Sequence, residues 1–304
     1  MRKILLAVHG GATADGAAHV ARLLRDRTGA SLDIVAVLEP VPIMDYGYGP
    51  VYIPDAETED ALAEDLRTEV DRQLSRCGLA GSRFTVVRGP RVSSIAAAAV
   101  ARSADLIVLG IGPHRLADRA LGGETSLHLA AQASTPVLAV PPQTRWLPQR
   151  ILAAVDFSGA SGGAARVVKS MLSGHERVEF AHATTAARIG RVVVGPSHAR
   201  DAERRLTEFA CHIGLPAGTH IHTNVLAGDP ARALLDTAAQ TGAELIALGS
   251  HGYTPWQRLL LGSVSSRVLR LADCAVLIYP GRCARATSAT EEDAAEAADA
   301  VVAS

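Results

Sequence analysis

The chain has few cysteines, and none of them stands in a recognisable pair. Its 304 residues include only Cys77, Cys211, Cys274 and Cys283, and no two of these have CxxC spacing. Such spacing is what marks a redox or metal motif. We therefore interpret the four side chains as ordinary thiols of a reducing compartment.

Neither charge is in excess, and long apolar runs are missing. Lys and Arg together number 30, against 31 for Asp and Glu, which leaves no basic footprint for nucleic acid or an anionic membrane. No apolar run approaches the length of a membrane span. The first apolar run ends at Val8, which is typical of a first strand rather than of a signal peptide. We expect a cytoplasmic protein without nucleic-acid or membrane partners.

A Gly-x4-Gly-Lys-Ser/Thr loop is also absent, which argues against a P-loop NTPase. The chain is rich in apolar residues, because 48% of its residues are hydrophobic and 20% are charged. This composition can supply two buried cores and argues against global disorder. A length of 304 residues is enough for two domains of common size.

The chain repeats one unit. Residues 3–9 match residues 150–156 at an offset of 147, and residues 105–110 match residues 244–249 at an offset of 139. The difference between the two offsets, 147 minus 139, places eight extra residues in the first half. The turn-rich residues 46–50 are their expected position. A period this long indicates two tandem domains rather than a solenoid.

Each half alternates short apolar strands with amphipathic helices, for example helices over 61–77 and 199–212. The predicted strands are 4–8, 31–38, 83–87, 106–109 and 137–140 in the first half, and 151–155, 177–182, 220–226, 245–248 and 276–279 in the second. This alternation predicts an α/β fold of two tandem doubly wound domains, each a five-stranded, mostly parallel sheet with helices on both faces. The expected domains are 1–142 and 148–281, followed by a flexible tail at 282–304.

The second half carries a glycine-bearing loop between a strand and a helix. Gly249-Ser250-His251-Gly252 follows the predicted strand and, after nine residues, Gly262-Ser263-Val264-Ser265 opens a helical pattern. Such a loop brings backbone N–H groups and a helix N-terminus to one point, which attracts phosphate. Glycine lets a backbone approach a ligand closely. The two serines add hydroxyls where a phosphate or its metal would lie.

This Gly-x2-Gly-x9-Gly-Ser spacing resembles the ATP-binding signature of the universal stress protein family. The resemblance implies a Rossmann-like fold of the adenine nucleotide alpha hydrolase type and ATP, alone or with Mg, as the ligand. It implies a site in the second half made of Asp156, Ala183, Gly249, Ser250, His251, Gly252, Gly262, Ser263, Val264 and Ser265.

Two of these positions and one pair of histidines have competing interpretations. Asp156, taken alone, is a helix cap or turn residue; beside the glycine loop it becomes a carboxylate facing a nucleotide or its metal. The resemblance assigns the backbone of Ala183 to adenine. His251 is either a solvated loop residue or a phosphate donor when protonated. His220 and His222 share a strand face but lack a third ligand, which favours surface residues over a metal site.

The first half departs from the loop pattern at three positions. At the two offsets, Gly252 corresponds to Pro113, Ser263 to Glu124 and Asp156 to His9. Proline removes an N–H donor. Two like charges about 4 Å apart repel by roughly 4 kcal/mol at an effective dielectric of about 20, so a glutamate disfavours a triphosphate. We expect a degenerate nucleotide site in this half.

Three functional classes fit the sequence. The first is a stress-regulatory module that holds ATP without fast turnover. The second is an enzyme, either a slow ATPase or a nucleotidyl transferase, although no catalytic residue is identified. The third is a nucleotide-free protein-interaction scaffold. The resemblance also implies that the last strands of the two halves, 137–140 and 276–279, pair within one chain as a pseudo-dimer. Homodimerisation is left open.

Overall fold

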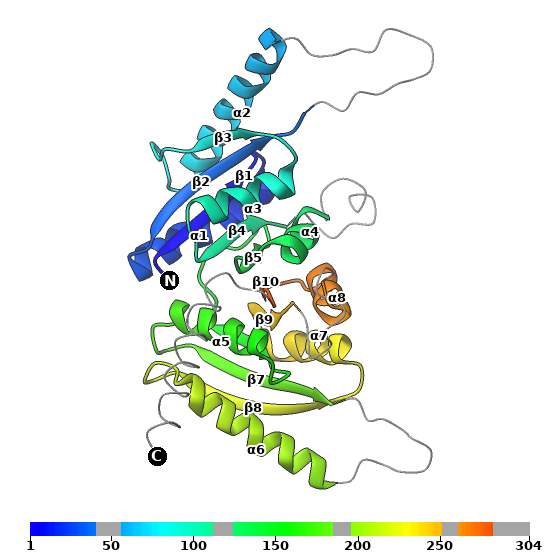
Figure 1. Ribbon diagram of the computed structural model, residues 1–304. Coiled ribbons are helices and arrows are strands. Elements are labelled where there is room, and N and C mark those ends of the chain that lie inside the picture. The colour runs from blue at the N-terminus through cyan, green and yellow to red at the C-terminus, as the bar shows by residue number, and fades with distance from the viewer. Residues whose placement is uncertain (41–55, 112–123, 185–195, 251–260, 282–304) are drawn as a thin grey trace, which may run out of the picture.

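The computed structural model describes residues 1–40, 56–111, 124–184, 196–250 and 261–281, and these form one ten-stranded sheet with helices on both faces (Figure 1). The strand order is β3-β2-β1-β4-β5-β10-β9-β6-β7-β8. Among the described strands, all pairs within each half are parallel, and the one antiparallel pair, β5 with β10, joins the halves. The predicted α/β class and doubly wound topology are confirmed.

The two halves have the same order of elements. The first half contains β1 (Lys3–Val8), the short 3₁₀ helix η1 (Ala12–Ala14), α1 (Asp15–Thr28), β2 (Ser31–Leu38), α2 (Ala56–Arg76), β3 (Thr85–Arg88), α3 (Arg91–Ala101), β4 (Leu106–Gly110), α4 (Glu124–Gln132) and β5 (Val137–Val140). The second half contains β6 (Arg150–Ala154), α5 (Gly159–Met171), β7 (Arg177–Thr184), α6 (Pro196–Ile213), β8 (His220–Ala227), α7 (Pro230–Thr241), β9 (Leu245–Gly249), α8 (Ser263–Leu271) and β10 (Ala275–Tyr279).

The strands form where apolar runs can be buried on both faces. The side chains of β4, β5, β9 and β10 are almost entirely buried, as expected for the centre of a sheet covered by helices on both sides. Helix ends follow local signals. Asp229 caps α7 by accepting the backbone N–H of Arg232 at 2.9 Å, and Gly242 ends that helix in the left-handed region at φ 63°.

Some element boundaries differ from the sequence prediction. The third strand begins at Thr85 rather than at residue 83, because the chain first completes a turn through Gly81, whose φ is +72°. The helix predicted over 61–77 begins earlier, at Ala56. Residues 46–50, the expected insertion, lie outside the described residues.

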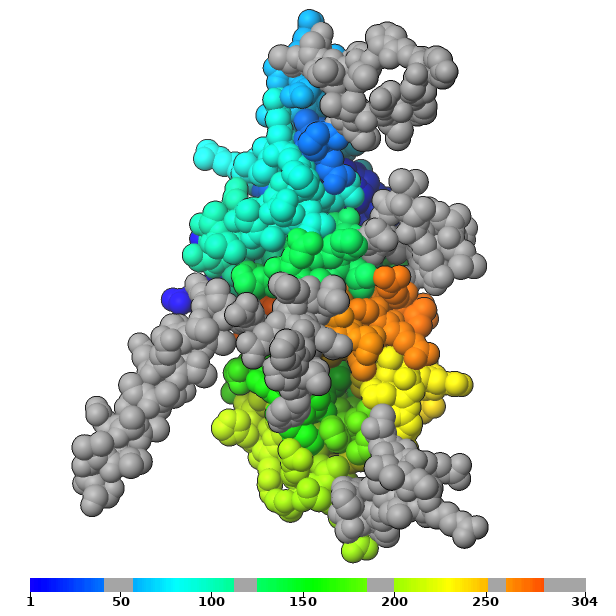
Figure 2. Space-filling model, turned by 45° about the vertical axis from the view of Figure 1, so that its right-hand side comes forward, coloured from blue at the N-terminus to red at the C-terminus, as the bar shows by residue number. Residues whose placement is uncertain are grey.

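The junction between the halves is built from backbone pairing and apolar packing. Val276, Leu277 and Ile278 of β10 lie opposite Ala139, Leu138 and Val137 of β5. A cluster of buried apolar side chains continues through both halves on one face, where α1 contacts α5. On the other face α4 contacts α8, and Figure 2 shows their surfaces adjoining, green against orange.

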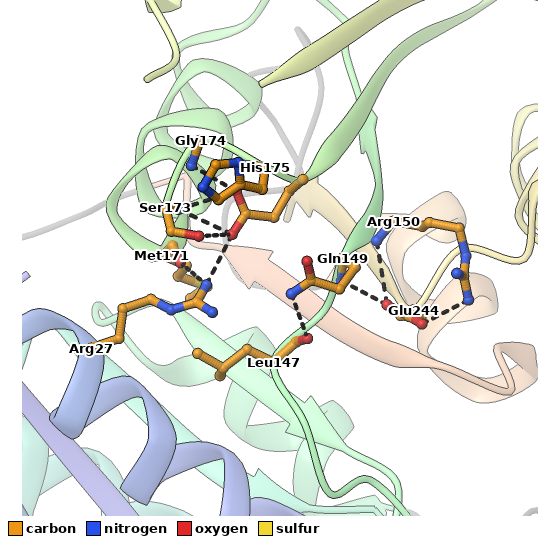
Figure 3. A network of polar contacts seen from close by, with 10 residues as sticks. Arg27, Leu147, Gln149, Arg150, Met171, Ser173, Gly174, His175 and Glu244 are labelled. Atoms are coloured by element: carbon orange, nitrogen blue, oxygen red, sulfur yellow. Dashed lines mark hydrogen bonds and ion pairs between the residues drawn. The ribbon is translucent and has the colours of Figure 1, made fainter. Parts of the chain in front are cut away.

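A buried carboxylate also links the two halves (Figure 3). Glu176, in the turn between α5 and β7, is fully buried, and its Oε1 accepts from Nη1 of Arg27 on α1 at 3.0 Å. The same guanidinium donates to the backbone carbonyl of Met171 at 2.9 Å. One arginine of the first half is therefore hydrogen-bonded to two groups of the second.

Among the described residues, no helix combines the length and the apolar character that crossing a bilayer requires.

Candidate functional site

The carboxyl ends of β9, β6 and β7 lie side by side, because these three strands are neighbours and parallel. Gly249 ends β9, Asp156 follows β6, and Ala183 is the last residue but one of β7. Three predicted site residues from distant parts of the sequence therefore meet at one edge of the sheet. In doubly wound sheets ligands bind at such an edge, where the strand order reverses.

The loop after β9 is held at both ends by Ser250, which is 2% exposed. The Ser250 N–H donates to the carbonyl of Tyr279 at 2.7 Å, and its own carbonyl accepts the N–H of Gly262 at 2.8 Å. Its hydroxyl oxygen accepts the N–H of Gly281 at 2.8 Å. Ser250 thus brings the two ends of the loop together. His251 and Gly252, between these ends, lie outside the described residues.

The N-terminus of α8 carries free backbone donors. Gly262 is the N-cap and supplies no side-chain cap. Within the described residues, the backbone N–H groups of Ser263, Val264 and Ser265 have no acceptor. The first N–H groups of any helix lack partners inside the helix, and with the helix dipole they favour an anion. Ser263 is exposed at this point, so its hydroxyl is accessible.

Two of the predicted site residues, Ser265 and Gly249, have structural roles. The hydroxyl of Ser265 is buried and donates to the carbonyl of Gly249 at 2.7 Å, which holds the loop against the helix. A Cβ at Gly249 would lie 2.7 Å from the Cβ of Ala160 and 3.1 Å from the backbone nitrogen of Ser161. The glycine is therefore required by the close approach of α5, whereas the sequence argument assigned it to ligand approach.

Asp156 supports the turn that starts α5 and keeps one oxygen uncommitted. Its Oδ1 accepts the backbone N–H of Ser158 at 3.0 Å and the Ser158 hydroxyl at 2.6 Å. Ser158, rather than Asp156, is the N-cap, accepting from the N–H of Ser161. Oδ2 of Asp156 has no hydrogen bond among the described residues. The half-buried carboxylate thus fits both interpretations, a turn residue and a ligand-facing group.

A group of ring and cation–π contacts next to Ala183 in the chain was not predicted from the sequence. Phe157 has a backbone φ of +63°. The centroid of its ring lies 4.7 Å from that of the His182 ring, with the two ring planes tilted by 46°. The Arg205 guanidinium carbon lies 4.1 Å from the centroid of the Phe157 ring. His182 donates from Nδ1 to the carbonyl of Val155 at 2.7 Å, which orients its ring. These residues come from β7, α6 and the turn after β6, so no local pattern brings them together.

The first half repeats the turn with a different residue. His9, which corresponds to Asp156, accepts the N–H of Gly11 on Nδ1 at 3.1 Å, two residues ahead, as Asp156 does from Ser158. Its Nε2 lies 2.9 Å from the hydroxyl of Thr13. Both imidazole nitrogens are therefore engaged within the loop, whereas Asp156 keeps an oxygen. Pro113 lies outside the described residues.

Within the described residues, no three His, Cys, Asp or Glu side chains come close enough to hold a metal ion. His220 and His222 lie exposed on the edge strand β8.

Comparisons with known proteins agree with one another. A universal stress protein of Mycolicibacterium smegmatis is 27% identical over 294 residues, covering 92% of this chain and 97% of that protein. Universal stress protein MJ0531 of Methanocaldococcus jannaschii is 44% identical over 61 residues, which are 20% of this chain and 36% of that protein.

The crystal structure of a universal stress protein from Archaeoglobus fulgidus has the same fold, with a TM-score of 0.62 at 20% identity over 91% of this chain and 96% of that one. The sequence model of the Universal stress protein family matches residues 1–141 and again residues 148–280. This double match covers most of the chain, which therefore belongs to the universal stress protein family as a tandem member.

Proposed function

We propose that the chain binds one ATP, alone or with Mg, in a domain spanning residues 148–281 and acts as a nucleotide-linked regulator of a stress response. The observation that carries this proposal is the loop closed by Ser250, which ends at the uncapped N-terminus of α8. That arrangement offers several N–H donors at one point, and these donors have no acceptor among the described residues.

In the proposed site, residues at three strand ends contact different parts of the nucleotide. The phosphates lie at α8, where the N–H groups of Ser263 and Val264 and the Ser263 hydroxyl donate to them. Asp156 faces the nucleotide or its metal with Oδ2, while Oδ1 remains on the Ser158 turn. By the family resemblance, the backbone of Ala183 contacts adenine. His251 and Gly252 complete the loop between the two described ends.

The first half, residues 1–142, serves in this proposal as a scaffold. Its strand-end residue His9 is engaged within its own loop, and Glu124 opens α4 where Ser263 opens α8. The antiparallel pairing of β5 with β10 supports its role as the second member of an intramolecular pseudo-dimer. One nucleotide per chain is the expected stoichiometry.

Binding without fast turnover is the favoured chemistry. Ordinary enzymes turn over at about 10 s⁻¹, and they do so with a placed general base or metal. At this edge of the described structure both carboxylates have partners: Asp156 accepts two hydrogen bonds on one oxygen, and Asp229 caps α7 and pairs with Arg267. A regulator that holds ATP needs no such base.

Calorimetric titration with ATP tests the proposal, with Gly262→Val as the variant and Gly123→Val, at the corresponding position of the first half, as the matched control. We expect one site in the wild type, an affinity loss of more than tenfold in Gly262→Val and none in Gly123→Val. Losing even one hydrogen bond to a charged group costs about 1.5–3 kcal/mol, and about 1.4 kcal/mol is tenfold. Two equivalent sites, or unchanged affinity in folded Gly262→Val, would contradict it.

A further inference from the structure

A cavity at the junction of the two halves lies apart from the proposed nucleotide residues. Its volume is about 220 Å³. One wall comes from the first half, where the turns before β4 and β5 contribute Asp105, Ser134 and Thr135. The other wall comes from α5 and from Tyr279 at the end of β10. The cavity exists because β5 and β10 run antiparallel, which places the amino end of one beside the carboxyl end of the other.

Two polar groups of the cavity, the Arg166 guanidinium and the Thr135 hydroxyl, have no partner among the described residues. Arg166 has no hydrogen bond or ion pair with any described residue, although it carries a full charge. Thr135 is only 7% exposed, and its hydroxyl likewise has no hydrogen bond in the described part of the chain. The Thr135 hydroxyl oxygen is itself not buried, so it is open to the cavity and available to a ligand or water.

Positions 163, 166, 167 and 170 of α5 recur at helical spacing and share one face. Gly163 is required there, because a Cβ would lie 2.3 Å from the Tyr279 ring. Val167, Pro136 and the Tyr279 ring make the wall largely apolar. Apolar walls with a few convergent polar groups are the usual character of a small-molecule site.

The charges decide which anion fits. Arg166 is the one arginine or lysine of the lining, and Asp105 is the one acid. Asp105 accepts the backbone N–H groups of Arg2 and Lys3 at 2.6 and 3.0 Å, which partly neutralises its charge without removing it. Met1 also lines the cavity, and with its α-ammonium the lining carries two positive charges against one negative charge, so one negative charge on a ligand balances it. The lining therefore favours a monoanion over a phosphate dianion.

We propose that this cavity binds a small organic monocarboxylate with an apolar body. Its carboxylate pairs with Arg166 and accepts the Thr135 hydroxyl, and its apolar part lies against Val167, Pro136 and Tyr279. A water molecule takes about 30 Å³ of liquid, so a cavity of about 220 Å³ has room for about seven water-sized groups, which suits a small organic acid. Benzoate and hexanoate have this size and charge.

The test is an NMR titration of the full chain with benzoate and with hexanoate. We expect one saturable site, weakened at least tenfold by Arg166→Gln and several-fold by Thr135→Val. The control is Arg177→Gln, an exposed arginine outside the lining and without an ion pair among the described residues, which should leave binding unchanged. Ser134→Phe, which fills the cavity, should abolish binding.

Inorganic phosphate is the competing probe, and it should not displace benzoate. The proposal is overturned if neither carboxylate binds saturably, if folded Arg166→Gln binds as well as Arg177→Gln, or if phosphate competes in an Arg166-dependent way. Repeating the titration in Gly262→Val separates this site from the nucleotide proposal, because benzoate binding should survive the loss of the α8 site.

Discussion

Glu176 shows at the scale of a single residue how a buried charge is accommodated. Its carboxylate accepts the backbone N–H groups of Ser173, Gly174 and His175 at 2.9–3.1 Å, the Ser173 hydroxyl at 2.7 Å and the Arg27 guanidinium. Burial raises the pKa of Glu176, but hydrogen bonds from the Ser173 hydroxyl and the turn's N–H groups outweigh burial and lower the pKa to about 2. The turn therefore depends on the ionised form.

Stability should fall in acid through this residue. A folded-state pKa of about 2, below the ordinary 4.5, means that the stabilisation is present above about pH 4.5 and is lost as the pH falls toward 2. The shift corresponds to about 3 kcal/mol. Urea unfolding of Glu176→Gln at pH 7 should show a free energy of unfolding that is lower by about this amount. Between pH 5 and 2 this free energy should depend less on pH than that of the wild type.

Glu203→Gln, which changes an exposed acid of α6, is the control and should retain the wild-type stability and pH profile. If Glu176→Gln and the wild type lose stability in parallel between pH 5 and 2, the assigned pKa is wrong.

Two glycines near the candidate site should respond in opposite directions to the same substitution. Gly249→Ala places a Cβ against Ala160, which should cost about 1–3 kcal/mol of stability, as overpacking does. Gly159→Ala has no atom within 4 Å of the new Cβ and lies in α5, so it should stabilise by up to about 1 kcal/mol. Thermal unfolding compares them, and equal effects would refute the packing argument.

At the scale of elements, α4 and α8 are the equivalent helices of the two halves. They cover Glu124–Gln132 and Ser263–Leu271, which correspond residue by residue at the offset of 139. Each has a buried serine at its third position, Ser126 or Ser265. The helix that follows the loop thus has the same form in both halves, and we attribute the proposed loss of nucleotide binding in the first half to side-chain changes.

Restoring those side chains should create a second nucleotide site. The variant His9→Asp, Pro113→Gly, Glu124→Ser removes one negative charge, returns one N–H donor and supplies the strand-end carboxylate. Aspartate can keep the turn hydrogen bond that His9 makes, as Asp156 does. Calorimetry should then find a second, weaker ATP site. A folded triple variant that still binds one ATP would show that the residues at these three positions are not the reason why the first half does not bind ATP.

At the scale of the whole molecule, the two halves share one sheet. β5 is an interior strand, with Val137, Leu138, Ala139 and Val140 each no more than 3% exposed. It is interior only because β10 covers it. Arg27 and Glu176 add a polar link on the α1 and α5 side. Either half alone would present an apolar edge strand.

Residues 1–142 expressed alone should therefore self-associate. An exposed, apolar strand edge is a template for pairing with another chain. Sedimentation velocity should show dimers or larger species of the isolated half under conditions in which its circular dichroism is native-like. A folded isolated half that sediments as a monomer would refute this role of β5. The full chain at the same concentration is the reference.

Local patterns were sufficient for the strands, the helices and the repeat. Apolar runs such as 31–38 and 137–140 became strands with those bounds, because burial on both faces leaves few alternatives for a short apolar segment. The glycine loop was also recognisable from a local pattern, because its residues are close in sequence. Element ends were less predictable, because turns such as that at Gly81 compete with strand propensity.

Contacts between distant residues could not be predicted in this way. The roles of Gly249 and Ser265 depend on how closely α5 and α8 approach the strand ends, and sequence spacing does not specify that distance. The contact of the Phe157 ring with the His182 ring, the Arg27–Glu176 pair and the junction cavity each join segments far apart in the chain. Periodicity reports which face of an element is buried, whereas the partner across that face is selected only when the whole sheet assembles.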